Sequence, residues 1–270
     1  MFKKITILLY ALAMTALVAF DPFGVVAQPF SSDGQRLKVE LSRSAFTVLA
    51  FPSKQPTTSA IILFGSGDGG WSDLEEAIAH SFQKEGCEVI GLDCNAYAKT
   101  DYDLQVLQTD YGKIARTVIA PFGPQPPPLV VGGYSMGAAQ AIAVAGGPSP
   151  PPGLVGLLLI DPLSRGRYGL HASDQMDILP TGPGTFGVNE FSDKMASLRV
   201  VQWHAENDLI DSQSWLDTLT AQYKLFTFPR ASHSYAVDRE DFLRQLVQSA
   251  QWIIEPPTNR AMTSPTTPKP

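Results

Sequence analysis

A serine, an acid and a histidine stand in this chain where they could form a nucleophilic catalytic site. Ser135 lies at the centre of residues 133–137, which read GYSMG and match the pattern G-x-S-x-G. A serine hydroxyl is a weak nucleophile until a histidine accepts its proton, and the histidine needs a carboxylate to orient it. The pentapeptide alone is a weak signal, so the surrounding elements and the downstream partners must support it.

His233 is the strongest candidate for the base. It lies between a predicted strand at residues 224–228 and a predicted helix at residues 238–254, which is where this type of site places its histidine. The other histidines are His80, His171 and His204. The first falls inside a predicted helix, the second falls in a long irregular segment, and the third would require an acid after it in the chain.

Asp208 is the predicted acid. It follows a predicted strand at residues 199–203, and the order serine, acid, histidine is the one used by hydrolases with a strand-turn-helix nucleophile. Glu206 and Asp211 are nearby alternatives, and Asp161 is a distant one. Any of these carboxylates could instead cap a helix or lie in a solvated turn.

Two backbone N–H groups should stabilise the oxyanion that forms on a carbonyl oxygen. We expect them to come from Met136, which follows the nucleophile, and from Asp68 in the Gly-rich segment 65–71. The Asp68 carboxylate should point away from the oxyanion, towards a cationic substrate group or a loop amide. Trp71 and Asp73, at the end of this segment, are candidate substrate-binding residues.

The same Gly-rich segment also fits a different motif. Gly65, Gly67 and Gly70 spell G-x-G-x-x-G between a strand and a helix, and Asp93 ends the next predicted strand. This is the fingerprint of a dinucleotide site. That reading leaves the serine, acid and histidine without a role, and no Lys-Ser/Thr pair completes a phosphate-binding loop. We therefore predict no cofactor, and no metal because no metal-ligand spacing stands out.

Alternating strands and helices must position these residues. The predicted strands are residues 37–41, 46–51, 59–64, 88–92, 129–132, 154–160, 199–203 and 224–228, and the predicted helices are residues 73–85, 101–120, 138–145, 213–222 and 238–254. The first two strands suit an antiparallel hairpin at a sheet edge, and Ser72 with Glu75 forms a capping box. The pattern predicts an α/β fold, the α/β-hydrolase fold, with a mostly parallel sheet covered by helices on both faces. Right-handed crossovers then bring the candidate residues to one rim.

Composition favours one globular domain. The chain has 270 residues, of which 44% are hydrophobic, and we place the domain at residues 28–255. Residues 162–198 are too long for a simple connection and are predicted to be a lid or binding insertion. Residues 256–270 are rich in Pro and Thr and are predicted to be disordered. The net charge of −6 argues against nucleic acid as a partner.

Two further features concern the cellular compartment. Residues 1–27 carry two lysines, an apolar run and a small-residue cleavage site after Ala27, as in an export signal. We expect a periplasmic or secreted protein, with an uncleaved membrane anchor as the alternative. Cys87 and Cys94 flank a predicted strand, which would hold them about 23 Å apart, beyond the reach of a disulfide.

Three segments resemble the bacterial virulence protein family VirJ and its relative AcvB. These segments are residues 66–74 (SGDGGWSDL), 89–93 (VIGLD) and 133–138 (GYSMGA), within a resemblance that extends over residues 59–254. The resemblance implies an exported α/β hydrolase with the nucleophile, acid and base on Ser135, Asp208 and His233. AcvB-type members imply hydrolysis of lysyl-phosphatidylglycerol, and VirJ implies an association with type IV secretion.

The sequence therefore predicts an exported serine hydrolase of the esterase or lipase type, acting on an ester, or on an aminoacyl-lipid at the membrane surface. A generic carboxylesterase or lipase is the alternative within the enzyme class. The second alternative is a non-catalytic envelope factor of hydrolase fold, with envelope or secretion-system proteins as its partners.

Overall fold

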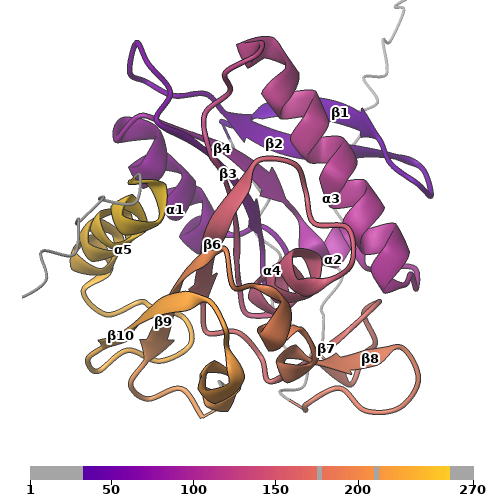
Figure 1. Cartoon of the computed structure of the whole chain (residues 1–270). Coiled ribbons are helices and arrows are strands. Elements are labelled where there is room, and N and C mark those ends of the chain that lie inside the picture. Colours follow the sequence, from indigo (N-terminus) through magenta and orange to yellow (C-terminus); the bar gives the residue numbers. More distant parts are fainter. Residues whose placement is uncertain (1–32, 175–177, 210–212, 256–270) are drawn as a thin grey trace, which may run out of the picture. The chain divides into compact units, whose positions relative to one another are not determined.

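The computed structural model describes residues 33–174, 178–209 and 213–255 (Figure 1). The predicted export signal at residues 1–27, the predicted tail at residues 256–270 and the alternative acid Asp211 lie outside the described residues. Within the described ranges, the helices are too short or too polar to cross a lipid bilayer.

One sheet of eight strands organises the described part of the chain. The strand order is β1-β2-β4-β3-β5-β6-β9-β10. The strands are β1 (Gln35–Glu40), β2 (Ala45–Phe51), β3 (Ala60–Gly65), β4 (Cys87–Leu92), β5 (Leu129–Tyr134), β6 (Leu154–Ile160), β9 (Arg199–Ala205) and β10 (Gln222–Phe228). The first two strands form the predicted antiparallel hairpin at the edge, β2 pairs antiparallel with β4, and all pairs from β4 to β10 are parallel. This confirms the predicted fold class.

Helices cover both faces of the sheet. On one face lie α1 (Asp73–Lys84) and α5 (Arg239–Ile254), and on the other lie α3 (Leu104–Ile119) and α4 (Met136–Gly146) (Figure 1). Strand β3 shows why its residues are continuously apolar. Ile61 and Leu63 belong to the core beneath α3 and α4, whereas Ile62 and Phe64 belong to the core beneath α1 and α5. Successive side chains of a strand point to opposite faces, so a strand covered on both sides must be apolar throughout.

A capping box marks the start of α1, whereas the predicted cap residue of α5 makes no capping bond. Helix α1 starts with the predicted capping box, in which the Ser72 hydroxyl accepts the Leu74 N–H and Glu75 accepts the Ser72 N–H at 3.0 Å. Asp238 occupies the predicted cap position of α5, but its side chain makes no capping bond. Its carboxylate instead pairs with the Arg230 guanidinium at 2.5 Å.

The predicted helix at residues 213–222 is wrong. The chain forms a short 3-10 turn, η4 (Ser214–Thr218), and then enters β10 at Gln222. Strand β10 pairs with β9 along its whole length, beginning with Gln222 opposite Arg199. The sheet partner thus overrides the weak helical spacing of the segment, because tertiary context outweighs local propensity.

The segment 162–198 folds beside the carboxyl ends of the strands. It contains β7 (Arg165–Arg167), its antiparallel partner β8 (Thr185–Gly187) and the 3-10 helix η3 (Val188–Lys194). Arg167 ties the segment together, because its guanidinium binds Asp174 at 2.8 Å and donates to the carbonyls of Thr181 and Pro183. The remaining short elements are α2 (Cys94–Tyr97) and the 3-10 turn η1 (Ala120–Phe122).

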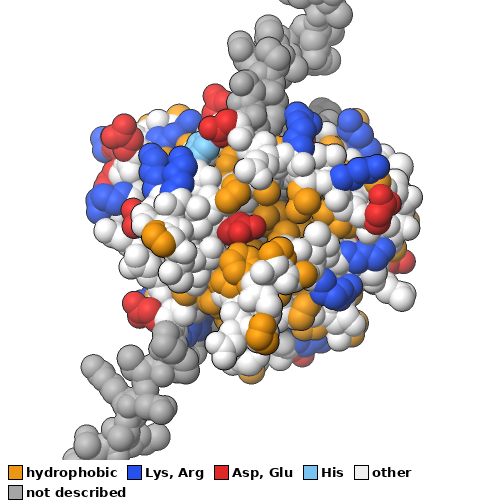
Figure 2. All heavy atoms as spheres, turned by 90° about the horizontal axis from the view of Figure 1, so that it is seen from above, with side chains coloured by type: hydrophobic (Ala, Val, Ile, Leu, Met, Phe, Trp, Pro, Cys, Tyr) orange, Lys and Arg blue, Asp and Glu red, His pale blue; other side chains and the backbone are white. Residues whose placement is uncertain are grey.

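The two cysteines are free and buried, with Cys87 at the start of β4 and Cys94 at the start of α2. Figure 2 shows the molecule from above the view of Figure 1. Hydrophobic side chains gather at the centre of this face, and most of its Lys and Arg side chains lie towards the edge.

The predicted site residues follow the carboxyl ends of the strands: Ser135 follows β5 and Asp208 follows β9.

Candidate active site

Ser135 occupies a sharp turn between β5 and α4. Its backbone angles are φ 53° and ψ −114°, which a residue with a side chain rarely adopts, and it is buried. The flanking glycines allow this turn. A Cβ atom on Gly137 would lie 2.3 Å from the Gly65 carbonyl oxygen, and one on Gly133 would lie 2.3 Å from the Gly137 carbonyl carbon. The strained nucleophile turn predicted from the pentapeptide is therefore present.

His233 and Asp208 meet at the same rim. The His233 Nδ1 atom lies 2.5 Å from Asp208 Oδ2, within hydrogen-bonding distance, and the Asp208 side chain is almost fully buried. The turn after β9 carries Asp208, whose N–H donates to the Ala205 carbonyl at 2.9 Å. The neighbouring Asn207 N–H donates to the Ala231 carbonyl at 2.8 Å, which joins the acid turn to the base loop.

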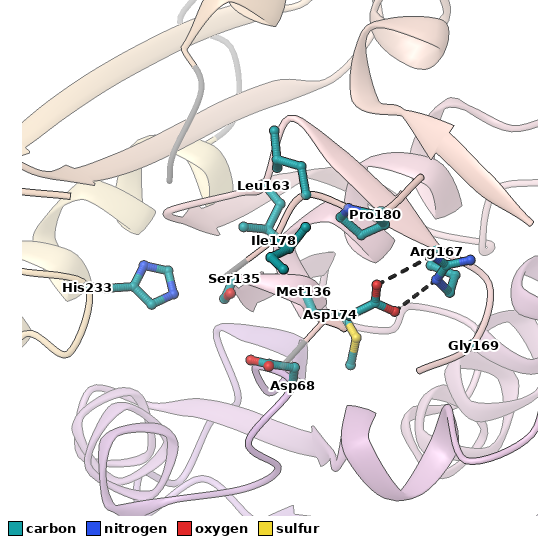
Figure 3. A pocket seen from close by; sticks show the side chains of 12 residues that line it. Asp68, Ser135, Met136, Leu163, Arg167, Gly169, Asp174, Ile178, Pro180 and His233 are labelled. Carbon is teal, nitrogen blue, oxygen red and sulfur yellow. Dashed lines mark hydrogen bonds and ion pairs between the residues drawn. The ribbon is translucent and has the colours of Figure 1, made fainter. Parts of the chain in front are cut away.

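His233 and Ser135 line one pocket, together with Asp68 and Met136. Figure 3 shows the imidazole facing the serine, with the Asp68 carboxylate on the same side of the pocket. The empty space between the pocket walls, including the open mouth, is about 560 Å³. The structure thus brings together the three candidate catalytic residues and the two predicted oxyanion donors.

The electrostatics around His233 favour its protonated form. Burial lowers the pKa of the imidazole, but the hydrogen bond and charge of Asp208, with the charges of Asp161 and Asp68, outweigh burial and raise the pKa above its usual value. A raised pKa means that the imidazole holds a proton more readily, as a base must when it accepts one from a hydroxyl.

The predicted oxyanion donors lie on two rigid segments. Met136 is the first residue of α4, so its N–H has no acceptor within the helix. Asp68 lies in a loop that is held from both sides. Asn95 Nδ2 donates to the Asp68 carbonyl at 2.6 Å, and the Gly67 N–H donates to the buried Glu75 carboxylate at 3.2 Å.

The two predicted substrate-binding residues, Trp71 and Asp73, do not line the pocket that holds Ser135. Trp71 does not line the pocket but is buried in the core, where its ring stacks on Phe51 at 5.9 Å and its N–H donates to Glu76 at 2.8 Å. A large aromatic side chain gains most by burial against the sheet. Asp73 is exposed in the first turn of α1, where its charge complements the helix dipole.

The alternative acids have other places. Glu206 is exposed and accepts the Arg230 N–H at 2.7 Å. Asp161 is fully buried at the end of β6, with Oδ2 at 3.9 Å from His233 Nδ1. Asp161, Asp208 and His233 each offer a ligand atom, and these atoms lie within 4.8 Å of one another, a spacing that a cation could use. The hydrogen bond between Asp208 and His233 already occupies two of them.

The dinucleotide reading of the Gly-rich loop fits the structure poorly. The Glu75 carboxylate lies beneath the loop and accepts its Gly67 N–H, so a negative charge stands where a phosphate would bind. Asp93 caps α2 by accepting the Ala96 N–H at 2.9 Å. The strand order also differs from the usual dinucleotide-binding order. In that order the third strand lies beyond the second, whereas here the strand that follows β4 in the chain, β5, pairs with β3.

Tyr134 is a site residue that the sequence did not single out. Its hydroxyl donates to the His233 carbonyl at 2.8 Å, and its ring lies 4.8 Å from the imidazole ring. On the other side, a Cβ atom on Gly67 would lie 3.1 Å from the Tyr134 ring. Burial, followed by the charges of Glu75 and Asp161, raises the pKa of Tyr134, so the phenol stays a donor at neutral pH. The sequence carries no signal for this role, because the second position of G-x-S-x-G is unrestricted.

The insertion supplies most of the pocket wall. Its contributions are Leu163, Gly166, Arg167, Gly169, Asp174, Ile178, Leu179 and Pro180. The aliphatic members give this wall an apolar character, and Figure 3 shows several of them opposite His233. Arg167 and Asp174 pair with each other, so the guanidinium is committed to the insertion itself. The length of the segment predicted a binding role, but no pattern indicated which residues would reach the site.

Comparisons with known proteins agree with this architecture. Residues 59–145 match the model of the family described as Bacterial virulence protein (VirJ). The three segments that carry the resemblance lie in this region, whereas Asp208 and His233 lie beyond it. No curated protein sequence matches the chain.

Solved structures of α/β hydrolases share the fold. A serine hydrolase homologue from Coxiella burnetii has a TM-score of 0.61 at 12% identity, covering 82% of this chain and 99% of its own. The esterase domain of a Rhodothermus marinus protein has a TM-score of 0.59 at 15% identity, over 82% and 97%. A serine hydrolase without lid from Xanthomonas campestris has a TM-score of 0.55 at 19% identity, over 84% and 99%. The chain therefore has the α/β-hydrolase fold, and its segment 59–145 is similar to the VirJ family.

Proposed function

We propose that this chain is a serine hydrolase that cleaves esters with Ser135 as nucleophile, His233 as base and Asp208 as orienting acid. The observation that carries the proposal is the contact of 2.5 Å between His233 and Asp208 in a base loop that lines the same pocket as Ser135. A strained serine turn, a buried acid and an imidazole at one rim are the parts that acyl transfer requires.

The proposed reaction follows from the geometry. The Ser135 hydroxyl attacks the ester carbonyl as His233 Nε2 accepts its proton, while Asp208 holds the Nδ1–H side of the ring. The N–H groups of Met136 and Asp68 stabilise the oxyanion. His233 then protonates the leaving alcohol, and water hydrolyses the acyl-enzyme by the same route in reverse. In the described chain the serine and imidazole face each other without a hydrogen bond between their side chains, a contact that often forms only with substrate bound.

An aminoacyl-phospholipid such as lysyl-phosphatidylglycerol is the substrate that we propose within this class. Two features support it. The Asp68 carboxylate lines the pocket beside the nucleophile, where it could attract the ammonium group of an aminoacyl ester, and the insertion offers an apolar wall for a lipid. The resemblance of the motifs in residues 66–74, 89–93 and 133–138 to AcvB-type proteins implies the same substrate.

Export to the periplasm or the exterior is part of the proposal, on the basis of the charged, apolar and small-residue regions in residues 1–27. Mass spectrometry of the protein recovered from the cell envelope should find a mature chain that begins at Gln28. A chain that still starts at Met1 would favour the retained anchor.

The central test is hydrolysis by the purified mature protein and its Ser135→Ala variant. We expect the variant to lose at least about 10³-fold in kcat/KM and to lose labelling by a fluorophosphonate probe. Ser197→Ala, at an exposed serine outside the pocket, is the matched control and should retain both. A folded wild-type protein that neither labels nor hydrolyses would point instead to a docking role for the fold.

The substrate is tested by comparing lysyl-phosphatidylglycerol, p-nitrophenyl esters and unmodified phospholipids. We expect kcat/KM for the lysyl lipid to exceed that for the unmodified lipids by about tenfold or more, the effect of one hydrogen bond to a charged group. Equal rates on all of these esters would indicate a generic esterase or lipase.

A further inference from the structure

Asp161 is a second acid next to the proposed catalytic residues, and the structure fixes it firmly. It directly follows β6 and is fully buried, with a positive φ of 42°. Its N–H donates to the Trp203 carbonyl at 3.0 Å, and its Oδ1 accepts the Ala205 N–H at 2.9 Å. The preceding carbonyl, that of Ile160, accepts the N–H of Ser135 at 2.9 Å. Asp161 is therefore held between the nucleophile turn and the strand that carries the acid.

The side chain of Asp161 faces two imidazoles. Its Oδ2 lies 3.9 Å from His233 Nδ1, and its Oδ1 lies 3.7 Å from His204 Nδ1. The Nδ1 edge of His233 therefore faces two carboxylates, that of Asp208 in a direct contact and that of Asp161 within 4 Å. Both carboxylates are almost completely buried, so little water screens their attraction for a positive imidazole.

A purely structural role would not require a charge at this position. An asparagine could accept the Ala205 N–H with its amide oxygen, and asparagine is among the residues that best tolerate a positive φ. A buried carboxylate is costly unless it interacts with a positive partner or donors. The partner on the side of the pocket is His233, which is positive when protonated, as it is after it takes the proton of the nucleophile.

We propose that Asp161 is a second positioning carboxylate of the site, which stabilises the His233 imidazolium together with Asp208 and keeps the ring oriented when Asp208 is removed. The inference rests on the proposed function of this site. The groups that face His233 are Asp208 after β9, Asp161 at the end of β6, Asp68 after β3 and the phenol of Tyr134 at the end of β5. Asp161 approaches on the same ring edge as Asp208, so it can replace part of the missing charge there.

The first test is a charge-neutral variant, Asp161→Asn, followed by NMR titration of the His233 imidazole. We expect the imidazole to titrate about one pH unit lower than in the wild type, because an opposite charge within about 4–6 Å shifts a pKa by at least that much. The acid limb of kcat/KM should move in the same direction. Glu206→Gln, which neutralises an exposed acid on the neighbouring turn, is the matched control and should leave the titration unchanged. An unchanged titration in Asp161→Asn would overturn the proposal.

The second test uses Asp208→Asn with Asp161 intact. With Asp161 in place, kcat should fall by roughly 10², and the double variant should fall by about 10⁴, the loss typical of a triad without an acid. A double variant that is no slower than Asp208→Asn would contradict the shared role. In Asp208→Asn the midpoint of the His233 titration should stay at or above the usual pKa of histidine. A midpoint below that value would also contradict the proposed role of Asp161.

These readouts separate the inference from the proposed function. If Ser135→Ala hydrolyses esters as fast as the wild type, the hydrolase assignment fails, but the NMR titration still reports the coupling because it requires no turnover. If Ser135→Ala is inactive while Asp161→Asn changes neither the His233 titration nor the pH profile, the proposed hydrolase function is supported and the proposed role of Asp161 is rejected.

Discussion

Ser135 shows how much local strain the proposed chemistry requires of one residue. Its φ of 53° is unfavourable for any residue with a Cβ atom, and the cost is sustained by β5 on one side and α4 on the other. Its own N–H is bonded to the Ile160 carbonyl, so the turn cannot relax without breaking a contact to the next strand. The same rigidity keeps the hydroxyl at the pocket, facing the imidazole.

The pH dependence of hydrolysis should reflect the environment of His233. The imidazole must be neutral to accept the serine proton, so activity should rise with pH through the His233 pKa. Because nearby carboxylates raise that pKa, the acid limb of kcat/KM should have its midpoint above the usual histidine value. A pH series of initial rates with a soluble ester would measure it. A midpoint well below the usual value would show that burial dominates over the carboxylates.

Tyr134 is expected to position the base. In Tyr134→Phe the ring remains, but the hydrogen bond to the His233 carbonyl is lost, which should cost roughly 1 kcal/mol of unfolding free energy. We expect kcat to fall roughly tenfold with KM nearly unchanged, since a small displacement of a catalytic group is enough to slow the reaction. Steady-state kinetics and chemical denaturation measure the two effects.

The control for this substitution is Tyr223→Phe, at an exposed tyrosine on β10. This control should change neither kcat nor the unfolding free energy. A loss of stability in Tyr134→Phe with kcat retained would reduce Tyr134 to a structural role.

At the scale of elements, the packing of α4 explains its composition. All eleven residues of α4 are buried, and most are alanine or glycine. Close neighbours surround the helix: a Cβ atom on Gly146 would lie 2.5 Å from the Phe191 Cβ of η3. A helix enclosed in this way has no polar face, so its sequence lacks the amphipathic period of a surface helix.

The elbow glycines provide a prediction for this element pair. Gly137→Ala would place a Cβ atom 2.3 Å from the Gly65 carbonyl oxygen and 2.5 Å from the Ser66 carbonyl oxygen, and both oxygens are backbone atoms that cannot move aside. We expect a loss of about 3 kcal/mol or more of unfolding free energy, at the upper end for overpacking. Gly69→Ala is the control, because no atom lies within 4 Å of the added Cβ, and it should change stability by less than about 0.5 kcal/mol. Equal melting temperatures for the two variants would refute the packing argument.

At the scale of the described fold, the sheet divides the core into two layers that share its strands. Cys94 lies in the layer beneath α3 and α4, and Cys87 lies in the layer beneath α1 and α5. Burial raises the pKa of both thiols, and the charges of Asp93 and Glu75 add to the effect at Cys94. Neither thiol is therefore suited to nucleophilic chemistry in the folded protein.

Thiol labelling should report the integrity of both layers. In the native protein, a thiol reagent at pH 8 should react with Cys87 and Cys94 at least roughly 100-fold more slowly than in guanidinium, because reaction requires opening of the core. Mass spectrometry after timed quenching would give the two rates. Rapid labelling of either cysteine under native conditions would mean that its layer is open to solvent.

The sequence by itself determined the features whose causes are local. The turn at Ser135, the capping box at Ser72 and the apolar strands follow from short stretches of sequence, because sterics, capping and two-face burial act within a few residues. The alternation of these elements then indicated a parallel sheet with one functional rim. Family resemblance reached the same fold through the motifs in residues 59–145.

Only the tertiary structure decided which candidates share the site. The contact between Asp208 and His233 joins residues 25 positions apart, and that between Tyr134 and His233 joins residues 99 apart, so no local pattern could exclude the alternatives to Asp208 or reveal the tyrosine. Trp71 turned inward because the sheet offered a surface for its ring, and residues 213–222 followed β9 rather than their own spacing. Contacts between distant segments form only when the whole sheet assembles, and they set the chemistry of the rim.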